Sequence, residues 1–493
     1  SLVGSEMCIR DSGNAMDAAI AGAVLLGLCE PQSTGIGGDC FALIAIPGQS
    51  DIIGVNGSGR APMAASAAAL REQGAQIVPP FKPDAITIPG AIDAFCHMSE
   101  NWGKLGLEAV LAPAIRYADE GIAVAPRVAF DWKHESKTLQ GHGRTHYLRD
   151  GAILGLGDVF HAPGQAEVLR RVAQHGRDAF YTGEIAEDML AAVQAMGGMH
   201  VMDDFVATHT DQTTPVIGAY KDVELVEHPP NGQGATAMLM LNMLSHFDIA
   251  DMDPVGTMRA HIEAEAGKLA YDARNRFIAD PDHTTRLEHM LSAETARQLA
   301  ALIDPKKAME SPAALSETVH KDTVYITVVD KDQMAVSLIY SIYEAWGSGI
   351  ASEKFGILLH NRGAGFTLEQ GHPNELAGGK RPMHTIIPAV LRQNGRVTMP
   401  FGVMGGGYQP KGHARFVSNM VDFGLDPQSA IDMPRCFSDA GVMKIERGYS
   451  DQVRQELADL GHKVEVPIKP IGGAQAILMH ENGVLEGASD PRK

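Results

Sequence analysis

Basic residues are scarce in this chain. Its 493 residues include 41 lysines and arginines against 60 aspartates and glutamates, which gives a formal net charge of −19 at pH 7. A protein that binds nucleic acid needs a basic surface to neutralise the phosphates. The charge balance argues against that class, and we expect no nucleic-acid partner.

Long apolar runs are also missing. The longest, from Ala18 to Cys29, contains glycines and is shorter than the ~20 residues that span a bilayer as a helix. A hydrophobic fraction of 45% is nevertheless ample for a core. The composition indicates a soluble globular protein, and we expect no membrane partner.

Cysteine is rare, and no CxxC pair or regular spacing occurs. The five cysteines are Cys8, Cys29, Cys40, Cys96 and Cys436. This pattern predicts neither a disulfide framework nor a zinc site. We expect the cysteines to be buried and to act as small hydrophobic residues. Unpaired cysteines favour the cytoplasm, while a periplasmic or secreted location stays open.

Several motifs of catalysis and ligand binding are absent. The glycine-rich turns at 35–38 and 402–407 fit neither GxxxxGK[ST] nor GxGxxG, and the sequence holds no HExxH and no GxSxG. These absences argue against phosphate binding, a metal site and the usual serine-hydrolase elbow. We expect no cofactor and no metal.

The first twelve residues differ from the rest. The stretch from Met7 to Asp11 back-translates to ATG TGT ATA AGA GAC, which resembles a transposon end used in sequencing libraries. We expect residues 1–12 to be a sequencing artefact that hides the native N-terminus. They are left out of the fold prediction.

Helical and strand patterns alternate along the chain. A small-residue helix is predicted from Gly13 to Glu30, then a hairpin, then mostly amphipathic helices up to residue 300. Alternating residues predict a strong hairpin, with strands at 323–329 and 334–340 around a turn at 330–333. Further strands are expected at 385–392, 397–403 and 474–480. The pattern indicates an α/β protein whose helical first part and sheet-rich second part share one core.

Five motifs, in order, carry a resemblance to a known family. They are SGNAMDAAI at 12–20, EPQSTGIGG at 30–38, LAPAIR at 111–116, YTGEIA at 181–186, and GSGI at 347–350 with GILL at 356–359. The chain from Gly13 to its end resembles the γ-glutamyltransferase family. Family members usually continue beyond residues 488–493, so we expect the C-terminus to be clipped.

The resemblance implies a four-layer αββα N-terminal-nucleophile hydrolase made as an inactive precursor. Autocatalytic cleavage between Asp322 and Thr323 would give a large subunit (13–322) and a small subunit (323–493) that stay together as one αββα unit. A hydroxyl is a weak nucleophile, and the α-amino group freed on Thr323 supplies a base with a pKa near ~8. The uncut chain should therefore be inactive.

Further catalytic residues are implied by the same resemblance. Gly405 and Gly406 match a glycine pair whose backbone N–H groups form the oxyanion hole, which suits residues without a Cβ. Ser341 matches a hydroxyl residue, usually threonine, that supports the nucleophile.

The predicted substrate pocket departs from the family pattern. Ser58 stands where the family has a carboxylate-binding arginine, and Arg60 follows two residues later. In the family, an Asn, a Gln and an Asp bind the α-amino and carboxylate groups of the substrate. This sequence has Tyr343, Arg362 and Gly365 at those positions. His384 and Thr385 replace paired serines. We interpret Arg60, Tyr343, Arg362, His384 and Thr385 as substrate-binding residues.

Arg362 would repel an α-ammonium group and attract a carboxylate. We therefore predict a small acidic acyl amide as substrate, either oxamate-like or glutaryl-like, cleaved through an acyl-enzyme by water or an amine. Two alternatives stay open: a true γ-glutamyltransferase that cleaves glutathione, and a non-catalytic, uncut binding protein. A homodimer is left open as well.

Overall fold

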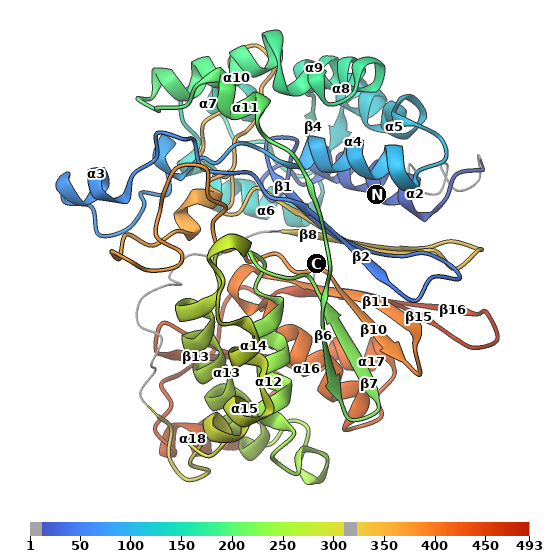
Figure 1. Ribbon diagram of the computed structural model, residues 1–493, viewed down its shortest axis with the longest axis vertical. Coiled ribbons are helices and arrows are strands. Elements are labelled where there is room, and N and C mark those ends of the chain that lie inside the picture. The colour runs from blue at the N-terminus through green and yellow to red at the C-terminus, as the bar shows by residue number, and fades with distance from the viewer. Residues whose placement is uncertain (1–11, 310–322, 493) are drawn as a thin grey trace. The chain divides into compact units, whose positions relative to one another are not determined.

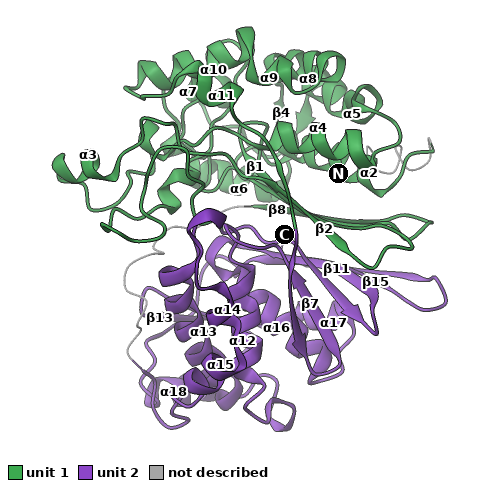
Figure 2. Cartoon of the chain, in the orientation of Figure 1, with its two compact units in different colours: residues 1–213, 321–384 green, residues 214–320, 385–493 purple. Residues whose placement is uncertain are grey.

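The computed structural model describes residues 12–309 and 323–492. The chain divides into two compact units, Ser1–Thr213 with Lys321–His384, and Thr214–His320 with Thr385–Lys493 (Figure 2). Each unit therefore combines segments from before and after residue 323. The expected artefact at residues 1–12 lies outside the described residues, except for Ser12.

Unit 1 is built on a five-stranded antiparallel sheet in the order β5-β2-β1-β9-β8 (Figure 1). Its strands are β1 Asp39–Ala45, β2 Ile52–Gly57, β5 Asp211–Thr213, β8 Val324–Val329 and β9 Ala335–Ser341. β1 and β9 are buried along their whole length. The predicted hairpin around 330–333 is thus confirmed; β9 pairs with β1 inside the sheet, and β8 ends the strand order.

The rest of unit 1 consists mainly of helices. They are α2 Ala15–Cys29, α3 Ala67–Glu72, α4 Ala91–Trp102, α5 Leu107–Glu120, α6 Pro126–Glu135, α7 Gly141–Tyr147, α8 Pro163–His175, α9 Asp178–Tyr181, α10 Gly183–Ala195 and α11 Met202–Val206, with a small hairpin of β3 Ile122–Ala123 and β4 Val159–Phe160. The helix predicted from Gly13 to Glu30 is confirmed as α2, which the side chain of Asn14 caps by accepting the N–H groups of Met16 and Asp17.

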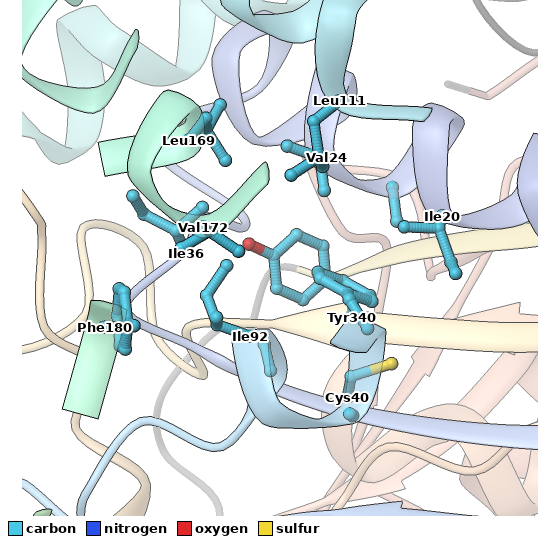
Figure 3. Packing of buried hydrophobic residues seen from close by; sticks show 14 of the residues in the cluster. Ile20, Val24, Ile36, Cys40, Ile92, Leu111, Leu169, Val172, Phe180 and Tyr340 are labelled. Carbon is cyan, nitrogen blue, oxygen red and sulfur yellow. The ribbon is translucent and has the colours of Figure 1, made fainter. Parts of the chain in front are cut away.

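The core of unit 1 lies between the sheet and α2, α4, α5 and α8. Figure 3 shows Tyr340 of β9 surrounded by apolar side chains of these helices, among them Ile20, Val24, Ile92, Leu111 and Val172. All are almost completely buried. α2 is lined with alanines, so the helix can approach β8 and β9 closely.

Unit 2 carries a six-stranded antiparallel sheet in the order β16-β15-β11-β10-β7-β6 and a three-stranded sheet, β12-β13-β14. The strands are β6 Val216–Tyr220, β7 Val223–Glu227, β10 Ala389–Gln393, β11 Arg396–Met404, β12 Cys436–Asp439, β13 Val442–Ile445, β14 Val464–Glu465, β15 Gly473–Met479 and β16 Leu485–Ser489. The helices are α12 Gly234–Leu244, α13 Thr257–Phe277, α14 Leu287–Leu291, α15 Ala293–Ala300, α16 Gln409–Val421, α17 Pro427–Asp432 and α18 Asp451–Asp459.

One strand is shorter than the sequence pattern predicts. We expected a strand from Thr385, but β10 begins at Ala389, directly after Pro388. Proline has no N–H to donate to a sheet, so pairing starts only after it. Residues 385–388, which include Thr385, therefore lie in a loop before β10.

Within the described ranges, no helix combines the length and the apolar character that a membrane crossing needs. Of the cysteines described there, Cys40 and Cys436 are buried as expected, whereas Cys29 and Cys96 are half-buried.

Candidate active site

The predicted nucleophile lies at the start of the β8–β9 hairpin of unit 1. Thr323 immediately precedes β8, is buried, and donates a hydrogen bond from Oγ1 to Ser341 Oγ at 3.3 Å. The β8–β9 register pairs Val324 with Tyr340, so the next pair along the ladder brings 323 opposite 341. Asp322, the other side of the predicted cleavage bond, lies outside the described residues.

Ser341 connects this hydroxyl to the predicted pocket. Its Oγ accepts the backbone N–H of Tyr343 at 2.9 Å. Tyr343 has a φ of +80°, in the left-handed region that a bulky side chain rarely adopts. Such strain persists where surrounding contacts fix the backbone, and it is common at active sites.

The close approach of the glycine-rich turn explains its composition. A Cβ on Gly38 would lie 2.5 Å from the carbonyl oxygen of Ser341. Only glycine allows the two backbones to come this close. The turn at 35–38 therefore packs on the strand end that carries Ser341.

Arg362 is a fully buried cation next to this strand end. It begins a short 3-10 helix, Arg362–Gly365, and its guanidinium stacks over the ring of Tyr343, 4.1 Å from the ring centre. Burial lowers the pKa of Arg362 to about 10, although the acidic neighbours Asp39 and Glu344 oppose this shift. The group remains positively charged at neutral pH.

A buried aspartate completes the cluster, and the sequence analysis missed it. Asp39 opens β1 directly opposite Ser341 in the β1–β9 register. One carboxylate oxygen accepts the N–H groups of Gly59 at 3.1 Å and Gly90 at 3.2 Å. Burial opposes ionisation, but two histidines and Arg362 outweigh it and hold the pKa of Asp39 well below its usual range.

The two histidines that face Asp39 are neutral. His384 donates from Nε2 to the Asp39 carboxylate at 3.1 Å, and burial lowers its pKa to about 3 with Arg362 acting in the same direction. Burial also lowers the pKa of His360, whose Nδ1 accepts the backbone N–H of Arg362 at 3.3 Å. The structure thus joins Asp39, His360, Arg362 and His384 in one buried cluster, which we call the Asp39 cluster.

One signal in the sequence could have revealed Asp39. It is the only charged residue in a strand that otherwise reads Cys-Phe-Ala-Leu-Ile-Ala. A carboxylate at such a position is costly unless it is paired. The histidines and the arginine that pair with Asp39 lie more than 300 positions away, so no local pattern identifies them.

Arg60 occupies a more exposed position than Arg362. Its side chain is 38% exposed, donates to the carbonyl of Gly379 at 3.0 Å, and lies 3.7 Å from the carboxylate of Asp211. These contacts are typical of an arginine that fixes a loop.

The glycine pair belongs to unit 2. Gly405 and Gly406 follow β11 with φ values of +120° and +55°, and a Cβ on Gly405 would lie 2.9 Å from the Cα of Gly472. The turn leads into α16, and backbone N–H groups at a helix start are good anion donors. Thr385, also in unit 2, is buried, and its carbonyl accepts a hydrogen bond from Gln233.

One group of metal-ligand residue types occurs among the described residues: His261, Glu265 and His462. His261 and His462 are hydrogen-bonded to each other at 2.8 Å, and the ammonium group of Lys268 binds Glu265 at 2.7 Å. The donor atoms are engaged with each other and with a cation. These residues form a hydrogen-bond network that does not favour a further positive charge.

Comparisons with known proteins agree with this architecture. The family model described as Gamma-glutamyltranspeptidase matches residues 1–493. The glutathione hydrolase-like YwrD proenzyme of Bacillus subtilis is 34% identical over 97% of this chain and 93% of its own length. The oxamate amidohydrolase proenzyme of Klebsiella pneumoniae is 33% identical over 98% of this chain and 94% of its own length.

A solved structure shares the fold. The cephalosporin acylase of Bacillus halodurans superimposes with a TM-score of 0.92 and 34% identity, covering 99% of this chain and 92% of that protein. The predicted N-terminal-nucleophile hydrolase fold is confirmed, and the protein is an enzyme of that type. From its motifs, its fold and these relatives, the chain belongs to the γ-glutamyltranspeptidase family.

Proposed function

We propose that the protein is an autoprocessed threonine amidohydrolase that cleaves small acyl amides carrying a carboxylate. The single observation that carries this proposal is the continuous set of contacts in unit 1 from Thr323 through Ser341 and Tyr343 to the buried cation of Arg362. A nucleophile and an anion-binding group lie on the same short segment of structure.

The chemistry follows from the proposed cleavage before Thr323. The hydroxyl hydrogen of Thr323, which points to Ser341 Oγ in the uncut chain, turns to the freed α-amino group. The amine takes this proton as Oγ1 attacks the amide carbon to give a tetrahedral oxyanion. The N–H groups of Gly405 and Gly406 would bind this oxyanion. The C–N bond then breaks, the protonated amine leaves, and water hydrolyses the ester to release the acid and restore Thr323.

Ser341 orients the nucleophile in this scheme. Its Oγ accepts two hydrogens, one from Thr323 Oγ1 and one from the Tyr343 backbone. A hydroxyl oxygen has two lone pairs, so both bonds can coexist. The strained backbone of Tyr343 therefore fixes Ser341, and Ser341 fixes the hydroxyl of Thr323.

Arg362 is the group of the Asp39 cluster that would bind a substrate carboxylate. It is a buried cation beside two neutral histidines, and the ionised Asp39 offsets part of its charge. A charge-assisted bond to a substrate carboxylate is worth about 1.5–3 kcal/mol. The names of two relatives, an oxamate amidohydrolase and a cephalosporin acylase, support an oxamate-like or glutaryl-like acyl group.

Glutathione hydrolysis is the second candidate. It is favoured by the similarity to the glutathione hydrolase-like YwrD proenzyme. A γ-glutamyl group carries an α-ammonium, and at ~4 Å two unit charges of like sign repel each other by about 4 kcal/mol near a protein surface. Arg362 therefore favours the carboxylate-only substrates over glutathione.

Intact-mass measurement of wild type and Thr323→Ala tests the proposal. We expect two fragments that meet between residues 322 and 323 in wild type and one uncut chain in the variant. Ammonia or amine release from oxamate, glutaramate, a glutaryl anilide and glutathione then ranks the substrates. An uncut wild-type chain that releases nothing from any amide would refute the proposal and favour a non-catalytic binding protein.

A further inference from the structure

A single buried glutamine contacts two of the predicted site residues in unit 2. Gln233 directly precedes α12, and its side chain is fully buried. Its amide nitrogen donates to the carbonyl of Thr385 at 2.7 Å and to the carbonyl of Gly406 at 3.0 Å. An amide NH₂ group has two hydrogens, so these two bonds use both.

The orientation of this amide is fixed from the other side. Arg274, in α13, is buried and donates from Nη1 to Gln233 Oε1 at 2.8 Å. Arginine is a donor only, so it selects the rotamer in which the oxygen faces Arg274 and the NH₂ group faces the two carbonyls. The contact thus determines which end of the amide reaches the glycine turn.

A second contact from α13 holds the same turn. The Tyr271 hydroxyl donates to the carbonyl of Gly407, and the Arg274 guanidinium lies over the Tyr271 ring, 4.6 Å from its centre. Two successive carbonyls of the turn, those of Gly406 and Gly407, therefore have donors from buried side chains. Glycine has no side chain that limits its backbone conformations. The two hydrogen bonds therefore limit the conformations of this glycine turn.

We propose that Gln233, oriented by Arg274, is a positioning residue that sets the direction of the Gly405 and Gly406 N–H groups. The inference rests on the proposed function, in which these N–H groups bind the oxyanion. The Gly406 carbonyl belongs to the peptide plane between Gly406 and Gly407, so its bond to Gln233 limits rotation about ψ of Gly406. The bond from Tyr271 limits the next plane, and the turn that carries the Gly405 and Gly406 N–H groups then has fewer accessible conformations. The bond to Thr385 ties the turn to the neighbouring loop.

This role predicts a specific kinetic signature. The oxyanion exists only in the transition state, so a misdirected turn lowers kcat and leaves substrate binding unchanged. Loss of one oxyanion donor costs roughly 10²–10³-fold in kcat. For loss of positioning alone we expect a decrease in kcat of about 10- to 100-fold, with KM within about threefold of wild type.

Two substitutions separate the donor from the bulk of the side chain. Gln233→Glu keeps the size and the acceptor for Arg274 but removes the two hydrogens and sets a carboxylate oxygen against two carbonyls. Gln233→Met keeps the length and removes all hydrogen bonding. Gln165→Glu and Gln165→Met are the matched controls, because Gln165 is a buried glutamine of unit 1 that donates to Tyr147 and Gly356.

Arg274→Met supplies a third variant that leaves Gln233 in place. We expect it to lower kcat by less than Gln233→Met does, and we expect the double variant to lose no more than Gln233→Met alone. Additive losses would show that the two residues act separately and would overturn the inference. A parallel change of kcat in the Gln165 variants would overturn it as well.

Hydrogen exchange of the full-length chain gives a readout that does not depend on turnover. We expect faster amide exchange in peptides that cover residues 402–408 in Gln233→Glu, Gln233→Met and Arg274→Met, with no change in the Gln165 variants. Unchanged exchange there refutes the inference even if wild type cleaves none of the amides. Faster exchange with an inactive wild type would instead refute only the proposed function.

Discussion

Replacing Arg362 by methionine tests the anion pocket most directly. The substitution keeps an unbranched side chain over the Tyr343 ring and removes the cation that lies 4.1 Å from the ring centre. If the substrate carboxylate binds Arg362, the loss is that of one charge-assisted hydrogen bond, about 1.5–3 kcal/mol. At 1.36 kcal/mol for each tenfold change, kcat/KM should fall roughly 10- to 150-fold.

The informative quantity is a ratio of two substrates. The assay compares release of p-nitroaniline from glutaryl p-nitroanilide with release from its methyl ester, which has the same acyl chain but no free carboxylate. We expect Arg362→Met to reduce the acid-to-ester ratio of kcat/KM by the same 10- to 150-fold. Damage to folding or to Thr323 would lower both rates together and leave the ratio unchanged.

Arg259→Met is the matched control. Arg259 is also a buried arginine stacked on a ring, that of Phe423 at 4.4 Å, but it lies in unit 2. We expect this variant to lose stability and to keep the acid-to-ester ratio of wild type. An unchanged ratio in Arg362→Met, or an equal change in both variants, would refute the proposed carboxylate site.

Three further outcomes are expected. Gly405→Ala should lower kcat by roughly 10²-fold, because the added Cβ meets the backbone of Gly472. Gly424 also has a positive φ but faces open space, so Gly424→Ala should leave kcat unchanged. Equal kcat values in the two variants would contradict the prediction. The pKa of His384 is about 3 in the folded protein and ~6.5 in the unfolded chain, so the free energy of unfolding falls as the pH drops between these values. Chemical denaturation from pH 7 to 4 should show a smaller decrease of this free energy in His384→Gln than in wild type. An identical slope in the two proteins would contradict the prediction. Asn14→Ala removes the α2 cap and should destabilise unit 1 by about 1 kcal/mol, seen as a lower melting temperature.

The sequence predicted local structure well where the pattern was strong. The alternation from Thr323 to Tyr340 predicts β8 and β9, and the helix predicted from Gly13 to Glu30 corresponds to α2. Both depend on residues within one short window, where hydrophobic period and turn residues decide the outcome. The exception is β10, where one proline shortens a run of strand-forming residues.

Contacts between distant segments could not be predicted in this way. Asp39 joins the candidate site only because β1 pairs with β9, and Gln233 reaches Gly406 only because α12 packs against α16 in unit 2. The local sequence around Asp39 indicates only the start of a strand, and the local sequence around Gln233 indicates only a turn. Burial of a polar group becomes informative only when its partners are known, and Gly406 lies 173 positions from Gln233 while His384 lies 345 positions from Asp39.

The pairing of strands across residue 323 determines what a cut at that position can do. β1 pairs with β9 in unit 1, and β7 pairs with β10 in unit 2. The main sheet of each unit therefore contains strands from both sides of the cut. The two products would share both hydrophobic cores, and neither would contain all the strands of the five-stranded or the six-stranded sheet. We therefore expect that mixed, separately labelled batches of the matured enzyme exchange no subunits until the whole fold is denatured, which makes maturation a one-way event for each molecule.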